Sequence, residues 1–170
     1  EEIAGVLLAT AKQVAQSVNS LEGCAIAALS EAQRLRECGW DRPIVLLPGF
    51  IDTAELDECR RLGIDPVIHS PYQLALMLAN PNGITRVWLK ANTGMNRLGL
   101  NAEAWHEALT ALSAVPNLAV VAMSHLACVD ELDSPVTRKQ KLQFDSLLAD
   151  TGAIRKTLAA SGGILAWPQT

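Results

Sequence analysis

Lys90 is the residue of this sequence best placed to do covalent chemistry. It closes the apolar run Arg86-Val-Trp-Leu-Lys90, where burying a charged ammonium is costly. A buried lysine tends to lose its proton, and the neutral amine can then form a Schiff base or react with CO₂ to give a carbamate. The alternative is that Lys90 extends its ammonium into solvent at the end of the strand.

Three further polar groups follow apolar runs or turns along the chain. Arg97 lies seven residues after Lys90, and its fork of donors could pair with a carboxylate-like group and a ligand anion together, or be a solvated loop cation. His125 ends an apolar run and could be a general base, a ring stacked on a planar cofactor, or a satisfied core residue. The segment Ser161-Gly162-Gly163 suits a phosphate but equally a plain turn.

Apolar runs and amphipathic segments alternate from one end of the chain to the other, and they predict the elements that position these groups. Strands begin at roughly the 30-residue intervals expected of βα units. The predicted strands are 24–29, 43–47, 66–69, 86–90, 118–123 and 157–160, and the predicted helices are 3–18, 30–38, 53–62, 72–79, 102–113 and 135–148.

This alternation predicts one α/β domain over residues 1–170, with parallel strands buried under helices. The number of strands favours an incomplete (β/α)₈ barrel with about six strands, and an open doubly wound sheet is the alternative. In both architectures the carboxyl ends of the strands gather at one rim. Lys90, Arg97, His125 and Ser161 are therefore expected to lie there together.

The composition excludes several classes of protein. Among 170 residues, 49% are hydrophobic and 19% are charged, and the net charge is −4, which indicates a globular domain without the basic face of a nucleic-acid binder. No apolar run approaches the ~20 residues of a membrane span, so we expect a cytoplasmic protein without a membrane partner. The four cysteines form no C-x-x-C pair, and we expect no metal site.

Two segments follow known motifs: Trp88-Leu-Lys-Ala-Asn-Thr-Gly-Met-Asn-Arg-Leu-Gly99 resembles L-K-x-D-T-G-M-x-R-L-G, and Met123-Ser-His-Leu-Ala-Cys-Val-Asp-Glu131 resembles M-S-H-F-A-x-A-D-E. Both motifs are typical of alanine racemases that depend on pyridoxal 5′-phosphate, and two further segments, in order along the chain, resemble the same family. Ala160-Ser-Gly-Gly-Ile-Leu-Ala-Trp-Pro168 resembles N-S-A-A-I-L-x-x-P. Ala25-Ile-Ala-Ala-Leu-Ser-Glu-Ala32 resembles the segment after the cofactor-lysine strand of the family.

The resemblance implies an isomerase that interconverts L- and D-alanine, a cell-wall precursor, through a pyridoxal-phosphate aldimine. It implies that Lys90 is carbamylated to N6-carboxylysine and that the carbamate orients Arg97. Arg97 would bond the phenolic oxygen of the cofactor and lie near the carboxylate of the amino-acid substrate. His125 would pack against the pyridine ring, and Ser161 would bind the phosphate. Full-length members of the family are homodimers.

The sequence departs from the family pattern in several places. Nothing upstream of residue 24 matches K-A-N-A-Y-G-H-G, and the last barrel strand and the β-rich second domain have no counterpart. Neither of the two proton-transfer bases is therefore present, and we expect a barrel domain that lacks both ends and is inactive alone. Asn92 replaces an aspartate and Ala160 replaces an asparagine. The alternatives are a non-catalytic barrel protein that binds pyridoxal phosphate and an inactive fragment.

Overall fold

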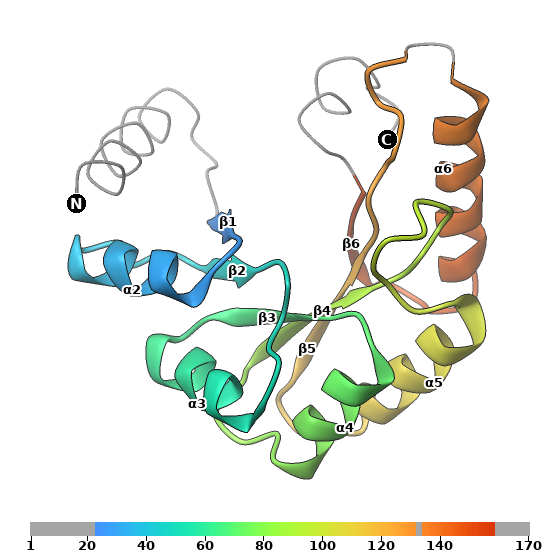
Figure 1. Cartoon of the computed structure of the whole chain (residues 1–170). Helices are drawn as coiled ribbons and strands as arrows, with labels where there is room; N and C mark the ends of the chain where they lie inside the picture. Colours follow the sequence, from blue (N-terminus) through green and yellow to red (C-terminus); the bar gives the residue numbers. More distant parts are fainter. Residues whose placement is uncertain (1–22, 132–133, 159–170) are drawn as a thin grey trace. The chain divides into compact units, whose positions relative to one another are not determined.

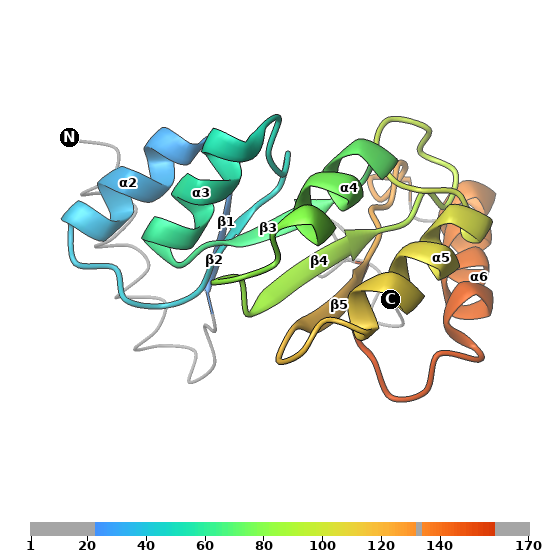
Figure 2. The same cartoon turned by 90° about the horizontal axis from the view of Figure 1, so that it is seen from below.

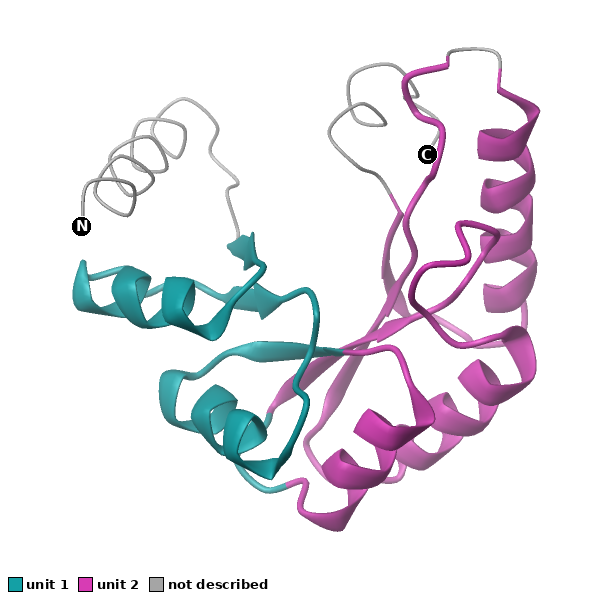
Figure 3. Cartoon of the chain, viewed as in Figure 1, with its two compact units in different colours: residues 1–67, 82–84 teal, residues 68–81, 85–170 magenta. Residues whose placement is uncertain are grey.

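The computed structural model describes residues 23–131 and 134–158, which form parts of two compact units. Unit 1 comprises residues 1–67 and 82–84, and unit 2 comprises residues 68–81 and 85–170 (Figure 3). Each unit is described by itself below. The expectation of one domain over residues 1–170 stays a prediction.

Unit 1 contains three short parallel strands and two helices, labelled in Figure 1. The strands are β1 (Cys24–Ile26), β2 (Ile44–Leu46) and β3 (Asp65–Ile68), whose last residue belongs to unit 2, and the helices are α2 (Leu29–Glu37) and α3 (Thr53–Leu62). Helix α3 begins where the Asp52 carboxylate accepts a hydrogen bond from the Glu55 N–H at 2.9 Å. It ends at Gly63, whose φ of 60° is the left-handed conformation that glycine favours.

Unit 2 contains the longer strands. They are β4 (Arg86–Lys90) and β5 (Ala119–Met123), with the short β6 (Arg155–Thr157), and the helices are α4 (Pro71–Ala79), α5 (Ala102–Ser113) and α6 (Pro135–Leu148). Val87 and Leu89 are fully buried on β4, as expected of a strand covered on both faces. The indole N–H of Trp105 on α5 donates to the Leu89 carbonyl at 3.1 Å, which fixes α5 against β4 next to Lys90.

Within each unit, the strands follow one another in space as they do in sequence. β1 pairs with β2 and β2 with β3 in unit 1, while β4 pairs with β5 and β5 with β6 in unit 2, and all four pairings are parallel. Right-handed crossovers between successive neighbours place successive helices on one face. Accordingly α2 packs against α3, and α4 packs against α5 (Figure 2). This is the winding of a barrel, whereas a doubly wound sheet reverses its strand order.

Most of the predicted elements agree with the structure to within two residues, and two strands differ more. The segment 24–29 is a strand only as far as Ile26, because Leu29 already opens α2. The last strand is Arg155–Thr157 rather than 157–160. Two of its residues are exposed cations, since main-chain pairing with β5 forms this strand and needs no apolar side chains. The predicted helix 3–18 lies outside the described residues.

Within the described ranges, no helix combines the length and the apolar character that crossing a membrane requires.

Candidate functional site

Lys90 is the last residue of β4, and only 7% of its surface is exposed. The strand places it beside Met123, the last residue of β5, in the parallel register. The next residue, Ala91, continues the pairing because its N–H donates to the Met123 carbonyl at 2.8 Å. Lys90 therefore lies at the carboxyl end of two adjacent strands, as predicted.

The loop that carries Arg97 is closed at its base by two backbone hydrogen bonds. Leu100 N–H donates to the Lys90 carbonyl at 2.9 Å, and Asn92 N–H donates to the Leu100 carbonyl at 2.8 Å. Gly99 makes this closure possible: its φ is +122°, and a Cβ there would meet the Asn92 nitrogen at 2.6 Å. The chain thus leaves β4 after Lys90, forms a loop that contains Arg97, and returns at Leu100 to the end of β4.

Asn92 organises the turn inside this loop. Its side-chain oxygen accepts hydrogen bonds from the N–H groups of Gly94 and Asn96, both at 3.0 Å, and its side-chain amide donates to the Asn96 side-chain oxygen at 3.0 Å. Asn96 has a φ of 56°, a left-handed conformation that asparagine tolerates. An aspartate could accept the two backbone bonds but could not donate the third. The departure from the family at position 92 therefore keeps the turn and removes a negative charge.

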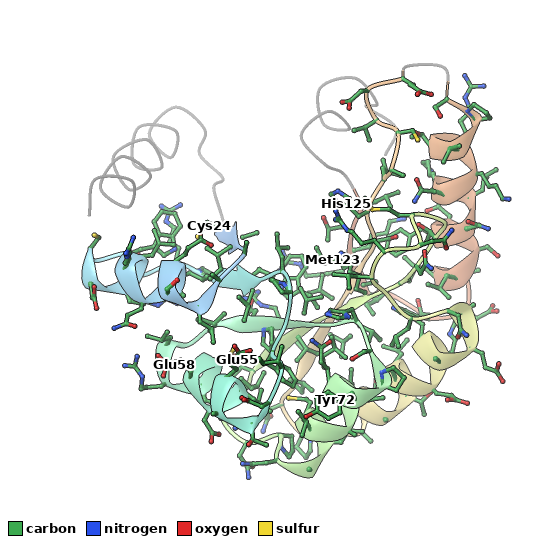
Figure 4. The ribbon with its side chains drawn as sticks, in the orientation of Figure 1. Cys24, Glu55, Glu58, Tyr72, Met123 and His125 are labelled. Carbon is green, nitrogen blue, oxygen red and sulfur yellow. The ribbon has the colours of Figure 1, made fainter. Side chains whose placement is uncertain are left out.

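His125 follows β5 by two residues (Figure 4), and its side chain is half-buried. Burial, and then the positive charges of Lys90 and Arg97, lower the pKa of the His125 imidazole. Burial, and then the charge of Arg97, also lower the pKa of the Lys90 ammonium. Arg97 therefore lies within electrostatic reach of Lys90, and both residues lie within electrostatic reach of His125.

Both shifts move the equilibrium toward the neutral forms of Lys90 and His125, and the Arg97 guanidinium lies within electrostatic reach of both. A neutral amine is a nucleophile, a neutral imidazole offers a flat ring and one free lone pair, and a guanidinium binds anions. The arrangement can thus hold a planar anionic molecule.

A buried hydrogen-bond network lies next to the three groups. The hydroxyls of Thr93 and Ser124 are 2.7 Å apart, and Ser124 donates to the Ala91 carbonyl at 3.0 Å. Gln140 of α6 reaches both segments, since its amide nitrogen lies 2.9 Å from the His125 carbonyl and 3.4 Å from the Thr93 hydroxyl. The network ties the loop of Arg97 and the segment of His125 to one helix.

A pocket of about 500 Å³ opens elsewhere in unit 2, between the start of the Arg97 loop and helices α5 and α6. Its lining includes Asn92, Thr93, His106, Lys139 and Leu142. Lys90, Arg97 and His125 do not line it, so the pocket and the group of three side chains are separate features.

The structure brings together three of the four predicted site residues, while Ser161 lies outside the described residues. His69, which also follows a strand, contacts Gln73 twice. The main-chain N–H of His69 donates to the Gln73 side-chain oxygen at 2.9 Å, and the Nε2 atom of its ring lies 3.2 Å from the Gln73 side-chain nitrogen. Sequence reasoning missed Gln140. The available signal was a polar residue on the buried stripe that α6 forms with Thr137, Phe144 and Leu147.

Comparison with known proteins places this chain in a family. The family model for the N-terminal domain of alanine racemase matches residues 8–170. The chain is 40% identical over 162 residues to the alanine racemase of Vibrio parahaemolyticus, which covers 94% of this chain and 45% of that protein. The chain thus spans less than half the length of this relative.

Solved structures agree on the fold. The biosynthetic alanine racemase of Pseudomonas aeruginosa matches with a TM-score of 0.80 and 31% identity over 93% of this chain and 45% of that one. The alanine racemase of Bartonella henselae, solved with covalently bound pyridoxal phosphate, has the same fold, with a TM-score of 0.75 and 23% identity over 85% of this chain and 43% of that one. These matches confirm the predicted α/β fold of barrel type. The chain belongs to the family of alanine racemase N-terminal domains.

Proposed function

We propose that this chain forms part of the cofactor site of an alanine racemase, an isomerase that interconverts L- and D-alanine with pyridoxal 5′-phosphate. The observation that carries the proposal is that Lys90 ends β4 and His125 follows β5, with Arg97 within electrostatic reach of both. Sites of barrel enzymes are built at those ends. The family match makes pyridoxal phosphate the first ligand to test.

The residues present fit this cofactor. Pyridoxal phosphate carries a phenolic oxygen and a phosphate, both anionic, on a flat aromatic ring. Among the described residues no carboxylate forms an ion pair with Lys90 or Arg97, so the charge of Arg97 remains available to an anion. A half-buried imidazole whose lowered pKa favours the neutral form is suited to packing against a ring.

Modification of Lys90 would complete the charge balance of this group. The neutral amine attacks CO₂, a C–N bond forms, and one proton is released to water, which leaves a carbamate on Nζ. The lowered pKa of Lys90 favours the reactive neutral amine. The carbamate replaces a like-charged neighbour of Arg97 by an oppositely charged one, and it can orient the guanidinium through paired hydrogen bonds.

Each residue then has a defined task. Arg97, held by the carbamate, binds the phenolic oxygen and lies near the carboxylate of the amino-acid substrate. His125 packs against the ring, and Ser161 binds the phosphate. The bound cofactor supplies an electron sink for the charge left on Cα when its proton departs.

The two groups that move the proton have no counterpart among residues 1–170, so we infer that this chain binds without racemising alanine on its own. Homodimer formation and a cytoplasmic location belong to the same proposal. They rest on the family and on the composition.

A binding experiment tests the proposal directly. The purified chain is titrated with pyridoxal phosphate and with 4-deoxypyridoxine phosphate, which lacks the aldehyde and cannot react with surface lysines. We expect saturable binding of both by fluorescence quenching, and about tenfold weaker binding for Arg97→Gln, since a charge-assisted bond is lost. Arg34→Gln removes one exposed arginine from unit 1 and is the matched control.

Two outcomes contradict the proposal: no saturable binding of the aldehyde-free analogue, or equal affinities for the chain and Arg97→Gln. An assay for D-alanine formation from L-alanine tests the expected inactivity. Turnover by the chain alone would overturn that part of the proposal.

A further inference from the structure

We propose that Gln140 of α6 is a positioning residue that holds the Arg97 loop and the His125 segment in place together. The inference deepens the proposed function, on which its relevance to cofactor binding rests. Its test uses the chain without any ligand.

Gln140 is 1% exposed, and its amide makes three hydrogen bonds. The side-chain oxygen accepts from the Ala127 N–H at 2.9 Å, and the side-chain nitrogen donates to the His125 carbonyl at 2.9 Å. The second donor of the same nitrogen points to the Thr93 hydroxyl at 3.4 Å. The Gln140 amide thus makes two hydrogen bonds to the segment that follows β5 and one to the segment that follows β4.

The hydroxyl groups give this network a direction. Ser124 donates its single proton to the Ala91 carbonyl, so in the 2.7 Å contact with Thr93 the donor is Thr93. The Thr93 oxygen is then free to accept from Gln140. The chain of donors runs from Gln140 through Thr93 and Ser124 to Ala91, the residue after Lys90.

This direction fixes the orientation of the Gln140 amide. A flipped amide would face its oxygen toward the His125 carbonyl and its nitrogen toward the Ala127 N–H, opposing like groups at both contacts. Glutamate has the same shape but no donor when ionised, and methionine has a similar volume but neither a strong donor nor a strong acceptor. Both substitutions therefore break the network without emptying the site.

The first measurement is hydrogen exchange, followed by mass spectrometry on peptides from three segments. For Gln140→Glu we expect about tenfold or greater acceleration of exchange in residues 91–97 and 124–128, with α5 unchanged. Gln143→Glu is the matched control, because it makes the same substitution at an exposed position of α6. Thr93→Val keeps the side-chain shape, and it should accelerate exchange in residues 91–97 only.

The second measurement is the titration of His125 by NMR. Gln140→Met removes the hydrogen bonds without adding a charge. Once the His125 carbonyl is released, the imidazole should move away from the burial and from the charges of Lys90 and Arg97 that lower its pKa. The pKa should therefore rise toward its ordinary value of 6.5. A purely structural role would lower the stability of the chain and leave this pKa where it is.

The proposal is overturned if Gln140→Glu accelerates exchange equally in α5, or leaves residues 124–128 unchanged, or if the His125 pKa stays constant in Gln140→Met. Should Gln140→Met not fold, Thr93→Val and the exchange of Gln140→Glu decide the matter. A chain that meets these expectations but binds no pyridoxal phosphate would refute the proposed function and leave the positioning role of Gln140 standing.

Discussion

The charge of Arg97 acts on the Lys90 ammonium at the end of β4, and no carboxylate of the described residues forms an ion pair with either residue. Burial, and the guanidinium charge, hold the pKa of the Lys90 ammonium below its ordinary value of 10.5. A charged Lys90 therefore lowers the free energy of unfolding of the chain. An apolar side chain at position 90 would make the fold more stable.

We therefore predict that Lys90→Met is more stable than the unsubstituted chain at pH 7. Since the folded pKa is lowered, the unfolded chain binds more protons between that value and 10.5, and stability rises with pH across this window. The advantage of Lys90→Met should shrink accordingly as the pH approaches 10.5. Urea unfolding of both chains in CO₂-free buffer, at pH 7 and at a pH near 10.5, measures this difference in stability. The titration of other groups affects both chains equally and cancels when the two free energies of unfolding are subtracted.

The variant Lys90→Met also tests whether Lys90 is carbamylated. If a carbamate forms at Lys90 and pairs with Arg97 as proposed, bicarbonate should raise the urea midpoint of the unsubstituted chain and not that of Lys90→Met. Sodium chloride at equal ionic strength is the control. An equal response of both chains to bicarbonate would argue against a carbamate at this position.

Arg97→Gln is predicted to raise the pKa of His125. Arg97 contributes to lowering this pKa, after burial and Lys90, so loss of its charge moves the value toward 6.5. In the unsubstituted chain the lowered pKa means that stability rises with pH between the folded value and 6.5, and this rise should become smaller in Arg97→Gln. NMR titration of His125 measures the first effect, and urea unfolding measures the second.

The control for this prediction is Lys139→Gln, which removes one positive charge from α6. Lys139 is not among the charges that act on His125, so the pKa should stay the same. If both variants raise the pKa equally, the effect comes from the net charge of the chain and not from the site.

Gly99→Ala is expected to destabilise the chain more than Gly94→Ala. The two glycines share the Arg97 loop and have nearly the same φ, +122° and +123°, so strain of about 1–3 kcal/mol is common to both substitutions. They differ in space: a Cβ at Gly99 would meet main-chain atoms of Ala91 and Asn92 at 2.6–2.9 Å, whereas a Cβ at Gly94 meets nothing closer than 3.6 Å. Urea unfolding of both variants isolates the cost of the close approach.

We expect a difference of at least about 1 kcal/mol between the two variants, because a main-chain clash forces the base of the loop apart. Binding of 4-deoxypyridoxine phosphate should weaken in Gly99→Ala, since Arg97 moves with the loop. Equal unfolding free energies of Gly99→Ala and Gly94→Ala would show that the loop can open at its base without loss of stability.

Strands β4 and β5 and helices α3, α5 and α6 could be predicted from the sequence almost to the residue, because each strand is an apolar run and each helix carries a periodic apolar stripe. Strand β6 could not, since it is formed by main-chain pairing with β5 and its first two residues are exposed cations. Pairing between distant segments leaves no periodic pattern in one of them alone.

The site divides in the same way. Lys90, Arg97 and His125 follow strands or turns, so their convergence at one rim follows from parallel topology. Gln140 acts through bonds to two main-chain groups and one hydroxyl, and such partners are set by tertiary packing. Asn92 was identified only as a lost charge, yet it holds the turn that presents Arg97.

Arg36→Lys is the last prediction and concerns the stability of unit 1. The Arg36 guanidinium donates to four main-chain carbonyls, those of Leu62, Trp40, Arg42 and Gly63, at 2.8–2.9 Å. It thereby joins the end of α2 to the end of α3. A lysine ammonium has three donors at one point and cannot reach four acceptors spread around a planar fork.

We expect Arg36→Lys to lower the free energy of unfolding by about 1–3 kcal/mol, because part-buried carbonyls lose their donors. Arg34→Lys makes the same change on an exposed face of α2 and should stay within about 0.5 kcal/mol of the unsubstituted chain. Hydrogen exchange should accelerate around residues 40–42 and 62–64 in Arg36→Lys, while β4 and β5 in unit 2 exchange as before. If the two variants unfold at the same urea concentration, water replaces the four hydrogen bonds of Arg36 without loss of stability. Apolar packing alone then holds the ends of the two helices together.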